Sequence, residues 1–426
     1  MNHRDTVRLP GYDLWMTFVR NVHVIPLILN VSMFRDALSN TVKIYPHVAG
    51  RLRNLPDGQW EIDLVGAAIP LYVESTSHIH LQHWVVQDHE NLGSFLCPPL
   101  PATAVVNEDL ALLQFKLTMS ENGDTAIGVS WHHALGDLTL LHRFMNTISR
   151  IYEGLEPSFP TPTFTKQHFP VPDAETLAKY SSFCPYLVHS LSGSKYGETQ
   201  RTISRVDWRV SRRELESLRG AVQLMIPALK VSLQDCLTAY VVTVINQHRP
   251  FSIKKVTNAA SYREIKAPFV QPDVAGNAIL IIPTEEDFRG GANIVEVAKK
   301  IRESLLHNLE ARRLEQSMSV ISYLMLLAAN EHRPPFFGIE TTTLSINSNI
   351  RLDWASVAFG YGGLARFYTC GYSRFYLRTF SSNPGVHEAS FDVSFGVPDD
   401  MKARVIQTLQ SDFGNLEFPR NIIGSL

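Results

Sequence analysis

The regular spacing of apolar residues stops between about residues 154 and 205 and resumes afterwards. The stretch begins EGLEPSFPTPTFTKQHFPVPD, whose closely spaced prolines cannot lie inside helices or central strands, because proline has no backbone N–H to donate. A chain of 426 residues is also too long for one small core. The sequence therefore predicts two α/β halves: a first domain over 1–175, a crossover linker over about 176–205 and a second domain over 206–426.

The first half alternates between helix and strand patterns. Residues 32–52 place Phe34 and Leu38 on one face and predict an amphipathic helix that ends at Pro46. From Leu138 an apolar face again recurs at helical spacing. The strand segments are 58–76, whose two runs we expect to pair with each other, and 110–120 and 124–133, separated by the polar turn ENGD.

The second half repeats this order. An apolar strand is expected at 277–284, and one long helix at 293–315 follows it. Neither half contains a short-period repeat or a low-complexity tract. The remaining segments are a helix at 234–247, strands at 255–261, 341–348 and 374–380, and a last strand and helix within 389–410.

Charge and composition exclude several partners. With 39 Lys and Arg against 41 Asp and Glu, the net charge of −2 leaves no field to hold a nucleic-acid backbone, so no nucleic-acid partner is expected. The N-terminus, MNHRDTVRLPGYDLWM, has charge and proline where a signal peptide needs an apolar core, and no run reaches about 18 apolar residues. We expect a cytoplasmic protein with no membrane span, and the scattered cysteines fit reduced thiols there.

The stretch GVSWHHALGDLTLLHRF, residues 128–144, ends a predicted strand with two histidines. A histidine at a strand end can act as a general base if its free nitrogen faces a cleft and another group fixes its tautomer. Asp137 could support His133 in this way, or it could simply cap the helix that follows. Because His132 and His133 alternate on the strand, one of them must face the core. The pattern H-x-x-x-D alone leaves a catalytic base and an ordinary turn both open.

A second histidine group has a spacing that resembles a metal site. His78 and His80 lie two residues apart and can share one face of a strand, and His83 follows three residues later. No nearby Cys, Asp or Glu completes a tetrahedral set, so surface or loop histidines are favoured and no metal is expected.

The segment VAFGYGGLARF resembles a glycine-rich phosphate loop only at first sight. Gly360, Gly362 and Gly363 are not followed by Lys-Ser/Thr, and the surroundings are rich in strand patterns, so a tight turn or bulge is favoured. The absence of G-x-S-x-G, H-E-x-x-H and Walker sequences lowers serine hydrolase, zincin and NTPase interpretations.

Four segments in the same order match a known family. They are YPHVAGRLRNLPDGQWEIDL at 45–64, the H-x-x-x-D of His133 and Asp137, NAASYREIKAPFVQPDVAGNAI with Arg263 thirteen residues before Gly276, and VAFGYGG. Together they resemble the YPLAGRL, H-x-x-x-D, Arg to Gly-Asn and D-F-G-W-G segments of BAHD-type acyl-CoA-dependent acyltransferases, in particular fungal members. The resemblance implies two similar chloramphenicol-acetyltransferase-like domains, with mixed β-sheets flanked by helices, a long crossover loop and an active-site channel between them.

The same resemblance implies separate roles for the residues of the first motif. His133 would remove the acceptor's proton as its oxygen or nitrogen attacks the acyl-CoA thioester. Asp137 would turn away from the histidine and pair with Arg263 across the two halves, as structural support for catalysis.

Further roles follow by position. Asn347 falls where the family commonly has a Thr or Ser and would donate to the tetrahedral oxyanion. Asn349 stands where the family often has an acceptor-site Trp, which makes it the acceptor-site candidate. Gly360 and Gly362 would form the turn of the glycine motif.

The chain departs from the family pattern at three positions. Ala358 replaces the Asp of D-F-G-W-G, Tyr361 replaces its Trp, and Leu138 replaces the usual Gly after H-x-x-x-D. These departures leave two alternatives to an acyltransferase: a condensation- or cyclisation-type catalyst on the same fold, and a non-catalytic ligand-binding member.

The implied partners are acyl-CoA as co-substrate and a small apolar acceptor that receives an acyl group, acetyl or longer. No tightly bound cofactor is expected. Two domains that face each other across a channel need no second chain, so a monomer is the default expectation.

Overall fold

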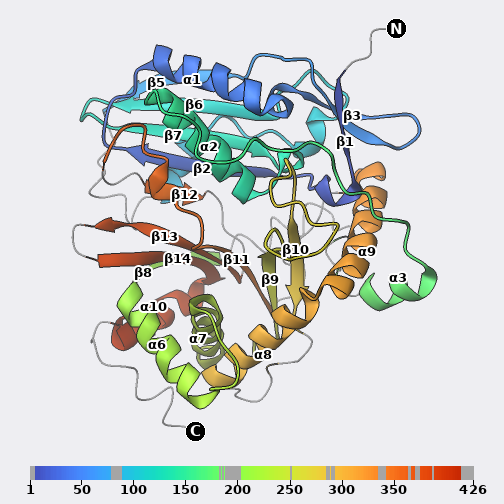
Figure 1. Cartoon of the computed structure of the whole chain (residues 1–426). Helices are drawn as coiled ribbons and strands as arrows, with labels where there is room; N and C mark the ends of the chain where they lie inside the picture. Colours follow the sequence, from blue (N-terminus) through green and yellow to red (C-terminus); the bar gives the residue numbers. More distant parts are fainter. Residues whose placement is uncertain are drawn as a thin grey trace.

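In the computed structural model the chain forms two α/β halves, each built on its own sheet. The first half of the chain is the upper one in Figure 1. Segments from the second half cross into the first. The structure describes residues 5–77, 89–181, 184, 187, 203–249, 252–284, 288, 293–333, 342–362, 366–369, 375–385 and 388–413.

The first half is built on a mixed five-stranded sheet of order β12-β2-β7-β6-β5. Every residue of its central strand β7 is buried, because α1 and α2 cover one face and the 3-10 helix η4 covers the other. Strands β5 and β6 are parallel, and the other neighbours are antiparallel. The elements are β2 (Phe18–Ile25), α1 (Val31–Ile44), β5 (Leu71–Thr76), η4 (His89–Phe95), β6 (Leu113–Ser120), β7 (Thr125–His132), α2 (Leu138–Tyr152) and β12 (Arg366–Thr369).

A separate three-stranded sheet lies beside this layer and corrects one expectation. The runs within residues 58–76 do not pair with each other: β4 joins the order β1-β4-β3, whereas β5 pairs with β6. The reason is that β1 and β3 occupy both edges of β4, which leaves β5 no edge to join there. These strands are β1 (Thr6–Leu9), β3 (Arg51–Asn54) and β4 (Trp60–Asp63).

The second half is built on a mixed six-stranded sheet of order β10-β9-β11-β13-β14-β8. Its helices bury their apolar faces against this sheet in one continuous core. The strands are β8 (Ile203–Ser211), β9 (Lys255–Ser261), β10 (Ile279–Pro283), β11 (Thr343–Asn349), β13 (Tyr376–Gly385) and β14 (Glu388–Pro398). The helices are α6 (Arg212–Met225), α7 (Leu233–Gln247), α8 (Ile294–Asn308) and α10 (Asp399–Phe413).

The prediction of one long helix over 293–315 is wrong, because the structure has two separate helices there. The first, α8, ends at Asn308, Glu310 is extended at φ −59° and ψ 132°, and α9 (Ala311–Asn330) begins in a new direction. The two apolar faces serve different cores: α8 faces the second sheet, while α9 places Met318 and Ile321 in a cluster with Tyr12 and Trp15 of the first half. A straight helix could not bury both faces.

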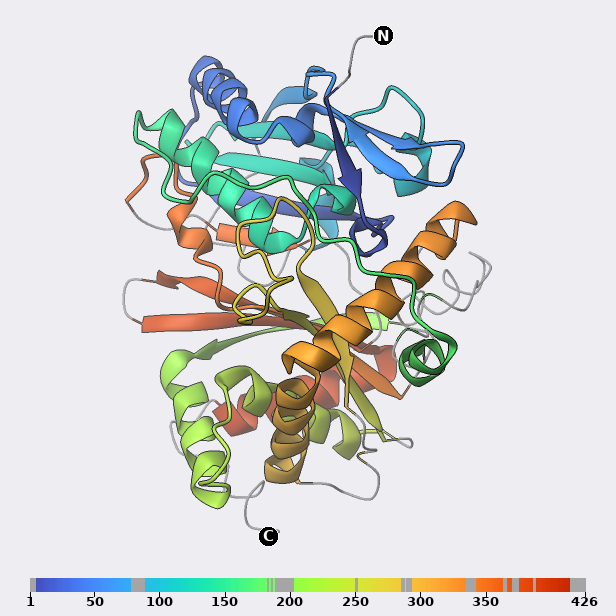
Figure 2. The ribbon, with the colours of Figure 1, turned by 45° about the vertical axis from the view of Figure 1, so that its right-hand side comes forward.

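Three segments tie the halves together. The extended segment 153–173 leads to α3 (Ala174–Ser181), which packs on α9. Helix α9 rises from the second layer to the small sheet of the first, as Figure 2 shows. Strand β12, late in the chain, returns to pair with β2 at the edge of the first sheet.

The loop between β11 and β12 docks on the first half through Phe359. Its ring stacks on Phe34 at 5.7 Å between centroids and meets Tyr152 edge-on at 5.5 Å. Its backbone N–H donates to Ser149 Oγ at 2.7 Å. The glycine motif therefore fastens this loop to α1 and α2.

We expect Phe359→Ala to lower the free energy of unfolding by about 3 kcal/mol, because it removes a fully buried ring from this contact. Urea titration measures the change. The control, Leu224→Ala, alters a side chain that is 82% exposed and should stay within about 0.5 kcal/mol of wild type. Equal stabilities for the two variants would contradict the assigned packing.

Candidate active site at the junction of the two halves

The turn after β7 is shaped by Gly136. The chain passes from β7 into the 3-10 helix η6 (His133–Leu135), then through Gly136 at φ +146°, and Asp137 caps α2. A Cβ on Gly136 would lie 2.6 Å from Leu140 Cδ2, so glycine is required for both its conformation and its lack of a side chain. The turn thereby presents His133 and Asp137 to the second half.

His132 faces the core. Its side chain is fully buried, with Nε2 at 3.1 Å from the Ala102 carbonyl oxygen and Nδ1 accepting the Ala134 N–H at 3.1 Å. The ring of Phe18 packs edge-on at 5.0 Å. Burial lowers the pKa of His132 to about 4, so it is neutral at physiological pH.

His133 lies partly buried at the junction. Its backbone N–H donates to the Thr17 carbonyl at 2.9 Å, and its ring packs against Trp15 with centroids 5.8 Å apart. Nδ1 is enclosed and has no hydrogen-bond partner among the described residues, while the residue as a whole keeps intermediate exposure. Burial lowers the pKa of the imidazole, opposed mainly by its own backbone carbonyl and by Asp137. A neutral imidazole that stays partly exposed can accept a proton.

Asp137 acts both as an N-cap and as one half of an ion pair. Oδ1 accepts the Leu140 N–H at 3.1 Å, while Oδ2 accepts the Ala278 N–H at 2.9 Å and lies 3.0 Å from Arg263 Nη2. In the part of the chain that the structure describes, it makes no hydrogen bond to His133. The structure thus brings Asp137 of the first half to Arg263 of the second.

Arg263 also holds the backbone of the loop before β10. Its guanidinium donates to the carbonyl oxygens of Pro272 at 3.0 Å, Val274 at 3.1 Å and Gly276 at 2.7 Å. The side chains of Asp137 and Arg263 are only 2% and 6% exposed, so this is a buried pair whose remaining hydrogen bonds are largely satisfied.

Sequence reasoning missed three residues of this junction. Asp13, fully buried, lies 2.7 Å from Lys166 Nζ and accepts the backbone N–H of Asn277 at 2.7 Å and its Nδ2 at 3.1 Å. Lys166 also donates to the Ala275 carbonyl. A weak signal in the sequence points to Asn277, which belongs to the Gly-Asn pair of the family motif. No signal points to Asp13, an isolated aspartate, or to Lys166, which lies in the proline-rich segment.

The asparagines of β11 lie apart from this network. Asn347 pairs in register with Ala259 and Arg378, and Asn349 is buried at the end of the strand. Within the described ranges, no hydrogen bond joins either to His133. Their proposed roles therefore depend on a substrate lying between β11 and the turn.

The glycine motif forms a turn, at a distance from the histidine network. Gly360 has φ +85°, the Tyr361 N–H donates to the Ala358 carbonyl at 3.0 Å, and Gly362 is exposed. Gly363 and the group His78, His80 and His83 lie outside the described residues. Elsewhere, the described side chains form no cluster of three potential metal ligands, and no described helix has the length and apolar character to cross a bilayer.

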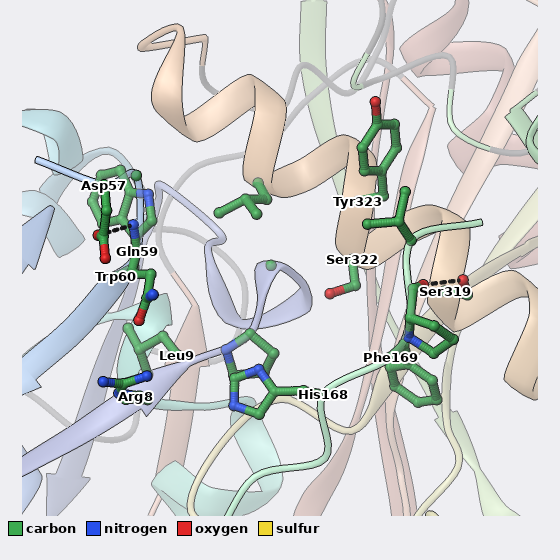
Figure 3. Close-up of a pocket in the computed structure, with 16 residues that line it drawn as sticks. Arg8, Leu9, Asp57, Gln59, Trp60, His168, Phe169, Ser319, Ser322 and Tyr323 are labelled. Carbon is green, nitrogen blue, oxygen red and sulfur yellow. Dashed lines mark hydrogen bonds between the residues drawn. The ribbon is translucent and has the colours of Figure 1, made fainter. Parts of the chain in front are cut away.

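A cavity of about 430 Å³ opens at the seam between α9, the small sheet and the extended segment. Figure 3 shows Ser322 extending from α9 toward it, opposite His168 and Trp60. None of the sequence-predicted site residues lines it. The 3-10 helix η1 (Gly11–Asp13) connects the two places, since Gly11 lines the cavity and Asp13 joins the network beside His133.

Comparisons with known proteins agree with this architecture. A family model described as Transferase family matches residues 12–374. A relative, 13-hydroxylupanine O-tigloyltransferase of Lupinus albus, is 27% identical over 140 residues, which cover 32% of this chain and only 30% of that protein.

Solved structures cover nearly the whole chain. TRI101 of F. sporotrichioides, complexed with coenzyme A and T-2, has a TM-score of 0.64 at 15% identity over 96% of this chain and 97% of its own. Vinorine synthase has a TM-score of 0.68 at 17% identity, over 96% and 94%. These likenesses confirm the predicted fold of two α/β domains with mixed sheets flanked by helices.

We expect Gly276→Ala to destabilise the protein by about 2 kcal/mol, because a Cβ there would lie 2.9 Å from Asp13 Oδ1 and closer still to Lys166 Nζ. Both groups are held in a buried pair and cannot easily move. Gly220→Ala, in α6 with open space around the glycine, is the matched control and should be neutral or slightly stabilising. Thermal unfolding of both variants measures the difference, and a neutral Gly276→Ala would refute the close packing.

Proposed function

The chain belongs to the Transferase family of BAHD acyltransferases, and on that premise we propose that it moves an acyl group, acetyl or longer, from acyl-CoA to a hydroxyl or amine of a small apolar secondary metabolite. The observation that carries the proposal is a neutral, partly exposed His133 at the junction of the halves, on the turn that the buried pair of Asp137 and Arg263 holds. The names of its relatives, an O-tigloyltransferase and a protein complexed with coenzyme A, support this class of substrates.

The proposed reaction uses His133 as a general base. Nε2 takes the proton of the acceptor as its oxygen or nitrogen attacks the thioester carbonyl carbon. The tetrahedral intermediate collapses with cleavage of the C–S bond, and the departing thiolate of CoA receives the proton from the imidazolium. Acyl product and free CoA leave, and His133 returns to its neutral form.

Two asparagines on β11 complete the proposed site. The Asn347 amide would donate to the oxyanion, where charge develops in the transition state. Asn349, buried at the end of the same strand, would contact the acceptor. Asp137 and Arg263 support the reaction by fixing the turn that carries His133.

We place this activity in the cytoplasm and in a monomer. The thiols of Cys97 and Cys236 are buried and form no disulfide, which suits a reducing compartment. Both halves of the proposed site come from one chain, since Asp137 and Asn347 lie on opposite sides of the crossover.

The purified protein incubated with acetyl-CoA or longer acyl-CoAs and a panel of alcohols and amines should release free thiol only when an acceptor is present. His133→Ala should lower the turnover by about a hundredfold or more, because it removes the general base. The control His307→Ala, an exposed histidine of α8, should keep wild-type turnover. Full turnover in His133→Ala would reject the assigned base.

Turnover only with a carrier-protein thioester would favour a condensation-type catalyst, and CoA binding without any turnover would favour a ligand-binding protein.

The pH dependence of kcat/KM should carry the signature of His133. A general base works only when unprotonated, so activity falls as pH falls through its pKa. Because burial lowers that pKa from the ordinary 6.5, the acidic limb should be centred below pH 6.5. A limb centred above this value would argue against a buried histidine as the base.

A further inference from the structure

An imidazole that acts as a base needs a partner on its other nitrogen. The partner keeps that nitrogen protonated and leaves the lone pair of the reacting nitrogen free. Asp137 does not fill this position, because Oδ1 bonds Leu140 and Oδ2 bonds Ala278 and Arg263. The groups left to orient the ring are its own backbone carbonyl and the side chain of Asn277.

Asn277 is the polar side chain that contacts His133 from the second half. Its Nδ2 donates to the His133 carbonyl oxygen at 2.9 Å and to Asp13 Oδ1 at 3.1 Å. Both partners can only accept, since one is a backbone carbonyl and the other a carboxylate paired with Lys166. These contacts assign the amide nitrogen, and hence the amide oxygen, without ambiguity.

Two buried polar atoms remain on the facing side. Asn277 Oδ1 and His133 Nδ1 are both enclosed, and neither has a hydrogen-bond partner within the described part of the chain. One is an obligate acceptor and the other a donor in one tautomer of the ring. Leaving both unpaired in a buried site is unfavourable, so a hydrogen bond that joins them is favoured.

We propose that Asn277 is the positioning residue of His133: its Oδ1 accepts the Nδ1–H of the imidazole and directs the Nε2 lone pair to the acceptor. The catalytic meaning of this inference rests on the proposed function, but the tautomer itself does not. The sequence suggested that Asp137 could fix the tautomer of His133. That role thus belongs to Asn277, which lies 144 positions after His133 on the other half of the chain.

Asp13 and Lys166 hold Asn277 in place. Asp13 accepts both the backbone N–H and the side-chain Nδ2 of Asn277, and Lys166 neutralises this fully buried carboxylate. An amide held by two acceptors on Nδ2 cannot turn its oxygen away from the ring. The orientation of His133 therefore depends on η1, the extended segment and the loop before β10 together.

The charged groups around His133 predict how its titration should change. The carboxylates of Asp137 and Asp13 face the ring from the turn and from η1, each paired with a cation, Arg263 or Lys166. Burial lowers the pKa of His133, and its own carbonyl, the two carboxylates and the Asn277 side chain oppose that effect. Loss of the Asn277 acceptor should lower the pKa further, whereas a carboxylate at that position should raise it.

The test is the ¹⁵N spectrum of the His133 imidazole over pH, assigned by its absence in His133→Gln. In wild type we expect the neutral ring to carry its proton on Nδ1. Asn277→Ala should mix the tautomers and move the titration to lower pH, and Asn277→Asp should move it to higher pH. The control Asp273→Asn, which breaks the 2.8 Å ion pair with Arg143 between the same halves without touching His133, should leave the spectrum unchanged.

Kinetics provide the second readout. Asn277→Ala should lower kcat about tenfold or more and leave KM for acyl-CoA within about twofold, as for a group that acts in the transition state. A wild-type ring protonated on Nε2 would overturn the inference without any variant. A folded Asn277→Ala with wild-type tautomer and titration would also overturn it and would assign the ring's orientation to its own carbonyl. Absence of acyl transfer in wild type would refute the proposed function alone, because the spectrum still decides the role of Asn277.

Discussion

The buried ion pair between Asp137 and Arg263 is the interaction on which the junction depends. Two charges removed from water are stable only if their remaining hydrogen bonds are satisfied. Here Asp137 also caps α2, and Arg263 also binds the carbonyl oxygens of the loop before β10. One contact therefore fixes the start of a helix, the course of a loop and the relation between the two halves. The proposed site lies where these three meet.

The turn after β7 that carries His133 is held in place by this junction. Gly136 provides the sharp bend that lets Asp137 reach across, and His133, four residues before Asp137, is placed against Asn277. Around the junction, α9, the extended segment and β12 each cross from one layer to the other. Because these segments cross between the halves, the two halves are held in one relative position, and a site shared by them keeps one geometry.

Local patterns predicted much of the fold, because β7 follows from its apolar run after the polar turn ENGD and α2 follows from helical spacing. The pairing of β5 and the break between α8 and α9 could not be predicted, since they depend on which edges and cores neighbouring elements leave open. At the site, the ion pair of Asp137 and Arg263 followed from a family resemblance. The contacts of Asp13 with Lys166 and Asn277 join residues 153 and 264 positions apart, and no local pattern encodes such distances.

A double-mutant cycle on Asp137 and Arg263 tests most directly whether this pair couples the halves. Asp137→Ala, Arg263→Ala and the double variant would be unfolded in urea. If the pair is a satisfied buried contact, each single variant strands a charge, and the double variant should lose at least about 2 kcal/mol less than the sum of the singles. Losses that add within about 0.5 kcal/mol would show that the two residues act independently and would contradict the account.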